Sequence, residues 1–101
     1  EEGQGEGQIV LGEAEVLTPE IVEAVEDLVE EIRKTIGEGG FGYSQVEELV
    51  IDLKSLQIQL LSSRPKTNIV REVLRSVAML LEGKPETERL NSAIQKMISP
   101  A

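Results

Sequence analysis

Apolar residues recur at intervals of three and four in four consecutive segments of this chain, and glycine or proline separates each segment from the next. This spacing places the apolar side chains on one side of an α-helix. Helices are predicted over residues 19–36, 45–61, 68–82 and 86–98. Short connections place consecutive helices antiparallel. We therefore expect an all-α fold, a small antiparallel bundle of three to four helices within residues 18–98, in which the first two helices form a hairpin that the others pack against.

Polar residues at the segment starts predict where the helices begin. Thr18 precedes Pro19 and is suited to cap the first helix. The Ser44 and Glu47 pair has the spacing of a capping box ahead of the second helix. Thr67 or Asn68 is expected to cap the third. Ile51 and Ile58 fall opposite the main apolar side of the second helix, so that helix needs a second neighbour.

Residues 1–17 form a glycine-rich leader in which Gly3, Gly5 and Gly7 alternate with polar residues. One interpretation is a flexible segment, because glycine loses the most backbone entropy on ordering. The other is a pair of short strands around Gly12, since glycine at alternate positions allows close approach of another backbone. A lone hairpin is marginally stable, so such strands would pair with copies from other subunits.

The composition argues against catalysis. The chain contains no cysteine and no histidine, which excludes thiolate nucleophiles, imidazole bases, zinc fingers and disulfides. No cofactor site is expected. Carboxylates at Glu26, Asp27, Glu30 and Glu31 are expected to form a solvated acidic face rather than a metal site. The chain is therefore predicted not to be an enzyme.

Residues 36–42 resemble the glycine-rich loop of protein kinases, whose amides cover nucleotide phosphates. In kinases that loop joins two strands and a lysine follows on the next strand. Here the flanking segments are predicted helices, and no other kinase motif is present. We therefore interpret residues 37–42 as a connection between two helices.

The chain has a net charge of −9, and its charged residues are distributed unevenly along the sequence. Residues 1–61 contain 15 acidic and 3 basic residues, whereas residues 62–101 contain 4 acidic and 7 basic residues. An acidic chain repels phosphates, which argues against a nucleic-acid partner. Opposite charges favour contact between the halves, within or between chains. A basic cluster of Arg64, Lys66, Arg71 and Arg75 is expected to meet the acidic face of the first helix, in the same chain or in a neighbouring copy. The alternative is that it binds an anion at the start of the third helix.

Apolar runs are shorter than the ~20 residues of a membrane span, so no membrane association is expected. A signal peptide is not expected either, because no basic region precedes an apolar stretch at the start of the sequence. Small secreted domains often depend on disulfides, so the lack of cysteine favours a cytoplasmic location.

The run from Leu53 to Gly83 resembles a helical tail module of uncharacterised bacterial proteins. In those proteins a helix ends in leucine, a short Arg-Pro-Lys turn follows, and a second helix closes with Leu-Glu-Gly, often behind a glycine-rich leader. Here Arg64-Pro65-Lys66 supplies the turn. The resemblance implies a non-catalytic helical module that accompanies conflict or signalling proteins.

Three functional hypotheses follow. The first is a protein–protein interaction module that self-associates as a homo-oligomer through Ile9, Leu11, Ile51 and Ile58. The alternative is an acidic inhibitor or antitoxin-like protein whose first helix occupies a basic groove on a target, through Glu23, Glu26, Glu30 and Glu31. The third is a designed bundle, which the irregular polar stretches after Ser55 argue against.

Overall fold

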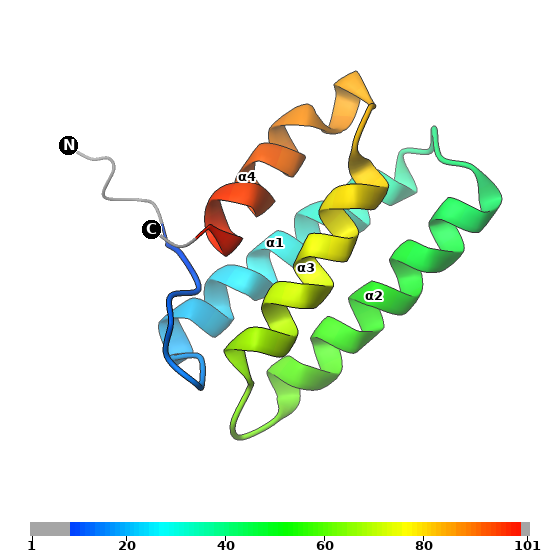
Figure 1. Ribbon diagram of the computed structural model, residues 1–101. Coiled ribbons are helices and arrows are strands. Elements are labelled where there is room, and N and C mark those ends of the chain that lie inside the picture. Colours follow the sequence, from blue (N-terminus) through cyan, green and yellow to red (C-terminus); the bar gives the residue numbers. More distant parts are fainter. Residues whose placement is uncertain (1–8, 100–101) are drawn as a thin grey trace.

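A computed structural model describes residues 9–99. Its helices are α1 (Pro19–Gly37), α2 (Tyr43–Leu61), α3 (Thr67–Leu81) and α4 (Glu88–Ile98), with a short 3-10 turn, η2 (Pro85–Thr87), before α4. Consecutive helices run antiparallel (Figure 1). Within this range there is no strand, so the all-α prediction is confirmed.

The helices form two layers. α3 lies between α2 and α4, and α1 crosses behind α3 (Figure 1). The Cα extents are 35 × 33 × 19 Å, and the smallest fits two helix layers. α2 packs more extensively on α3 than on α1. The first two helices therefore pack on each other less closely than the expected hairpin would require. The central helix of the bundle is α3.

Capping residues differ from prediction in α2 and α3. The prediction is confirmed for α1, where the backbone N–H of Ile21 donates to Thr18 Oγ1 at 3.3 Å. α2 begins at Tyr43, before the predicted Ser44 cap. The N–H of Gly42 donates to Gln45 Oε1 at 3.3 Å, so Gln45 rather than Glu47 supplies the side chain that reaches back to the helix start.

α3 begins without a side-chain cap, because Thr67 is buried and Asn68 lies inside the helix. The N–H of Thr67 donates to the carbonyl of Glu15 at 3.1 Å. A backbone contact from another segment therefore satisfies the donor that the sequence assigns to a cap. α3 ends at Leu81, and Gly83 follows with a φ of +88°.

The core is aliphatic and lies between the two layers. Each helix contributes residues from one side, because apolar positions three and four apart share a face. The fully or nearly fully buried core side chains of the helices are Val25, Leu28, Val29, Ile32, Leu49, Leu53, Leu56, Val70, Leu74, Val77, Ala78, Leu81, Ile94 and Ile98.

The described part of the leader, residues 9–17, is an N-terminal strap that runs along the edge of the bundle beside the start of α1 in Figure 1. Leu11 and Leu17 are buried in the core. The backbone N–H of Leu11 donates to the carbonyl of Met97 at 2.9 Å, and the N–H of Leu17 donates to the carbonyl of Pro65 at 2.9 Å. The strap contains one isolated β-bridge, Val16 to Lys66. Residues 9–17 therefore do not form the two short strands, because their apolar residues complete the core of the same chain.

Arg71 of α3 ties three backbone segments together. Its Nη2 donates to the carbonyl of Gly12 at 2.6 Å, and its Nε donates to the carbonyl of Ile98 at 3.2 Å. Only 14 % of its side chain is exposed. The guanidinium therefore links the strap and the end of α4 to the start of α3.

Polar side chains fix the register between α2 and α3. Ser76 Oγ donates to Asp52 Oδ2 at 2.6 Å, near the middle of both helices. Gln45 Nε2 donates to the carbonyl of Leu80 at 2.8 Å, near the other end of α3. No such bonds join α1 to α2 within residues 9–99. Side-chain hydrogen bonds therefore hold α2 against α3, whereas within the same residues none holds α2 against α1.

Candidate interaction surface

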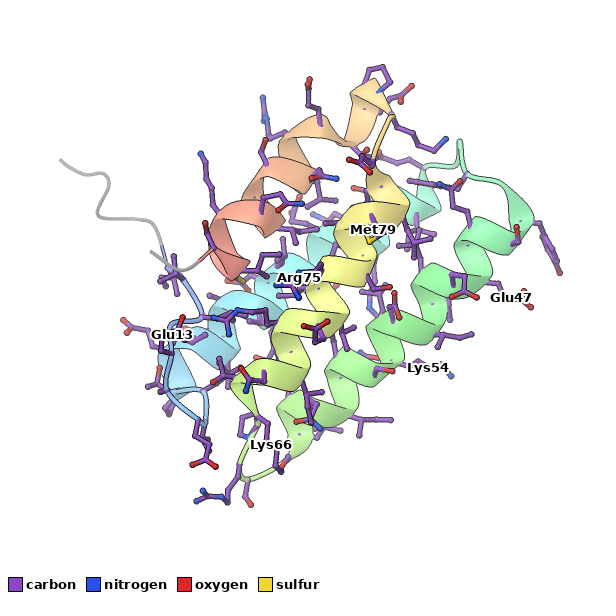
Figure 2. All side chains as sticks on the ribbon, viewed as in Figure 1. Glu13, Glu47, Lys54, Lys66, Arg75 and Met79 are labelled. Carbon is purple, nitrogen blue, oxygen red and sulfur yellow. The ribbon has the colours of Figure 1, made fainter. Side chains whose placement is uncertain are left out.

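Apolar side chains remain exposed on the side of α2 that faces away from the core. We define this outer stripe as Val50, Ile51, Ile58 and Leu61. Ile51 is 54 % exposed, Ile58 is 68 % exposed and Leu61 is 85 % exposed. Ile51 and Ile58 lie seven residues apart, so they share a face two turns apart. Glu47 and Lys54 interrupt the stripe and also point away from α3 (Figure 2).

A groove runs along the open contact between α1 and α2. Three adjoining hollows form it, and neighbouring hollows share Glu26 and Leu60 or Lys54 and Gln57. The groove extends from Pro19 and the α2–α3 connection to the far end of α1 at Gly37. Because α1 has 19 residues, this length is about 28 Å.

The floor of the α1–α2 groove is apolar. Val29 and Leu53 are buried beneath it, and Leu60 is half-buried. Ile58 and Leu61 of the outer stripe form part of its wall on the α2 side. The groove therefore combines buried floor residues with apolar side chains that have no covering partner within residues 9–99.

One rim of the groove is acidic. We define the acidic ridge as Glu23, Glu26, Asp27 and Glu30 of α1, all exposed and all lining the groove. Glu30 lies 3.9 Å from Arg33, in a pair that is largely exposed. Within residues 9–99 the other three carboxylates form no ion pair. The ridge is therefore a strip of negative charge beside an apolar floor.

The predicted self-association residues separate into two groups. Ile51 and Ile58 are exposed on one face of α2. Ile9 is half-buried in the strap. Leu11 is 1 % exposed in the core of its own chain, so the structure corrects its assignment to a contact with another copy. The physical reason is that the strap folds back over the bundle and uses Leu11 to close it.

The predicted acidic residues also separate. Glu23, Glu26 and Glu30 lie along the groove. Glu31 is exposed but does not line it, and its carboxylate lies 3.9 Å from Lys34 Nζ. Asp27 lies on the ridge in place of Glu31, because it is four residues after Glu23 and three residues before Glu30 and so shares their side of the helix.

The basic cluster does not meet α1 as expected. Arg71 binds the strap and the end of α4, and Arg75 pairs with Glu72 on its own helix. Arg75 lies on the outer surface of α3, and Lys66 lies at the α2–α3 connection (Figure 2). The expected contact with the first helix of the same chain is therefore wrong for Arg71 and Arg75. The physical reason is that carbonyl groups and a neighbouring acid lie nearer to them.

The glycine-rich connection of residues 38–42 joins two helices, as predicted, and Gly39 and Gly40 have φ values of +89° and +92°. Lys84 anchors it, since its Nζ donates to the carbonyl of Gly40 at 2.7 Å and lies 5.1 Å from the centre of the Phe41 ring. The flanking elements are helices and not strands, and the two glycines supply the positive φ values of the turn between them.

Sequence reasoning gave too little weight to Leu61, the most exposed residue of the outer stripe. Its signal is its place three residues after Ile58, at the end of α2. Met79 of α3 is 69 % exposed and was not singled out. It lies among the polar residues on the side of α3 opposite the core and points to the outer surface (Figure 2).

No three metal-binding side chains come together within residues 9–99. No helix in that range is long and apolar enough to cross a membrane. Searches against protein-family models, curated proteins and solved structures find no match for this chain. The surfaces of α1 and α2 are therefore the basis for a functional interpretation.

Proposed function

We propose that this chain is a non-catalytic protein–protein interaction module that self-associates through the outer stripe of α2. The observation that carries the proposal is the exposure of Ile51, Ile58 and Leu61 along one helix. An antiparallel pair of α2 helices brings Ile51 of one copy against Ile58 of the other, as a twofold contact requires. The absence of cysteine and histidine from the sequence supports the non-catalytic part.

The strength of this pairing follows from the burial it offers. Complete burial of an aliphatic side chain stabilises by about 1.5–3 kcal/mol. Six partly exposed side chains, three from each copy, contribute about 6–12 kcal/mol in total. Association costs about 4–15 kcal/mol in lost freedom of motion. We therefore expect a weak dimer whose population depends on concentration.

Charge gives the dimer a characteristic salt dependence. Each copy has a net charge of −9, so two copies repel each other. Salt screens exposed charges beyond about 10 Å at 0.1 M ionic strength. Added salt should therefore strengthen self-association, because the attractive contact is apolar.

Solution mass measured by light scattering across a dilution series tests the proposal. We expect the mean mass to rise with concentration and with salt. Ile51→Lys combined with Ile58→Lys should restore the monomer mass, since it places charge in the contact. These lysines reduce the net negative charge, so weaker association cannot be attributed to greater repulsion.

Ile69→Lys combined with Met79→Lys is a matched control, because both residues are exposed apolar residues of α3 outside the outer stripe. The control should associate like the original chain. A monomer at every concentration and salt level, or equal loss of association in both variants, would contradict the proposal.

A second candidate function rests on the acidic ridge. The exposure of Glu23, Glu26 and Glu30 supports an inhibitor whose α1 binds a basic groove on a target. Such binding would weaken with salt, in the opposite direction to self-association. Glu→Gln changes at these three positions and at Glu31 should abolish it.

A further inference from the structure

The α1–α2 groove has a shape that suits a helix. It is straight because two antiparallel helices form its sides, and its length of about 28 Å matches roughly five helical turns. An amphipathic helix binds such a groove through apolar residues at positions i, i+3, i+4 and i+7. A peptide that adds as a β-strand would need an exposed strand edge, and residues 9–99 contain no strand. A polyproline helix would need a groove lined by aromatic side chains, and none of the described residues that line this groove is aromatic.

The groove also carries asymmetric charge. The α1 side presents the four carboxylates of the acidic ridge. Lys54 and Arg33 are the basic residues that line the groove within residues 9–99, and Arg33 lies beside Glu30. An occupant therefore meets an apolar floor and, along one flank, an excess of negative charge.

We propose that the α1–α2 groove binds a cationic amphipathic helix of another protein. The apolar face of that helix lies on Val29, Leu60 and Leu61, and its lysine or arginine residues lie along one flank, above the acidic ridge. This partner goes beyond self-association, because it uses the groove floor and the acidic ridge, neither of which belongs to the outer stripe, and because salt affects the two contacts in opposite directions. Val50, Ile58 and Leu61 belong to both surfaces, so the helix and a second copy of the chain compete.

A second copy of this chain does not have the chemistry for the groove. Its exposed apolar helix face belongs to α2, where Glu47 and Glu48 are also exposed. Its basic helices α3 and α4 turn their apolar sides into the core. Charge complementarity therefore favours a cationic helix from outside the chain.

Binding of a synthetic peptide tests the proposal. The probe is an 18-residue helical peptide with leucine at positions i, i+3, i+4 and i+7, lysine along one flank and a fluorescent label. The control peptide has glutamate in place of lysine. Fluorescence anisotropy at low salt should show binding of the lysine peptide with Kd below about 100 μM, and none of the glutamate peptide. Raising the salt to 0.5 M should weaken binding.

Two variants of the chain probe the rim and the wall. Glu26→Gln with Glu30→Gln should weaken binding about tenfold, because two charge contacts are lost. Leu61→Ser should weaken it about five- to tenfold through lost apolar contact, and its high exposure leaves the fold intact. Glu31→Gln with Glu48→Gln is the matched control, since neither residue lines the groove, and it should change Kd less than twofold.

The results separate this proposal from self-association. Ile51 does not line the groove, so Ile51→Lys should remove the dimer while the peptide still binds. Failure of the lysine peptide to bind more tightly than about 1 mM would overturn the proposal. It would also be overturned if the control pair weakened binding as much as the rim pair, because that result indicates attraction by net charge alone.

Discussion

Replacing Arg71 with alanine should open the strap and destabilise the whole domain. The side chain donates charge-assisted hydrogen bonds to the carbonyls of Gly12 and Ile98. Hydrogen bonds of this type are worth about 1.5–3 kcal/mol each. The bond to Ile98 is long, at 3.2 Å, and water can reach the exposed edge of the site, so we expect a total loss of about 2–4 kcal/mol.

The nearby Arg75 provides a matched control on the same helix. Its guanidinium pairs with Glu72 alone, and 48 % of its side chain is exposed. An exposed helical pair of this spacing contributes about 0.2–0.5 kcal/mol. Arg75→Ala should therefore leave stability almost unchanged, although it removes the same charge and the same side-chain length.

Urea unfolding followed by circular dichroism measures the difference. With a slope of about 2 kcal/mol per M, Arg71→Ala should lower the midpoint by about 1–2 M. Hydrogen exchange supplies a local measurement, since the amide of Leu11 bonds to Met97 beside the Arg71 site. That amide should exchange faster in the milder variant Arg71→Lys, which keeps the charge but cannot reach both carbonyls. Equal midpoints for Arg71→Ala and Arg75→Ala would refute this reasoning.

Two further predictions concern single positions. Thr67→Val should stabilise the fold by about 1 kcal/mol in urea unfolding, because Thr67 Oγ1 is buried without a hydrogen-bond partner among residues 9–99 and valine has nearly the same shape. A loss of 1 kcal/mol or more would mean that the hydroxyl has a partner. Gly83→Ala should destabilise by about 1 kcal/mol because Gly83 has a φ of +88°, whereas Gly37→Ala, at a helical position, should stabilise by about 0.5–1 kcal/mol. Thermal unfolding of both variants decides this, and a change of the same sign in both would contradict the backbone argument.

The helices could be predicted because their signals are local. Periodic apolar residues, Thr18 before Pro19, and Gly83 act through neighbours three or four positions away. The predicted start of α2, residue 45, is two residues later than the observed start at Tyr43, because the side chains of Gln45 and Glu47 are both able to reach back to a helix start. Only the geometry of the glycine turn decides between them.

The strap and the groove could not be predicted, because both depend on contacts between distant parts of the sequence. The sequence around Leu11 and Leu17 does not show whether these side chains face solvent, another copy of the chain or the core of their own chain. The bond between Ser76 and Asp52 closes α2 against α3, and it joins residues 24 positions apart. Because α2 is held against α3 in this way, it packs less closely on α1, and the groove lies between α1 and α2. The acidic ridge was visible in the sequence, but the apolar floor beside it was not.

The hydrogen bond between Leu11 and Met97 brings the first and last parts of the described chain to one edge of the bundle. A short linker could join residues 9 and 99 there, and new ends could be opened within residues 38–42, where exposed glycines form the turn. Such a circular permutant should keep all four helices. The same geometry makes the bundle suitable for insertion into a loop of another protein, since a host would need to move its two attachment points only slightly apart.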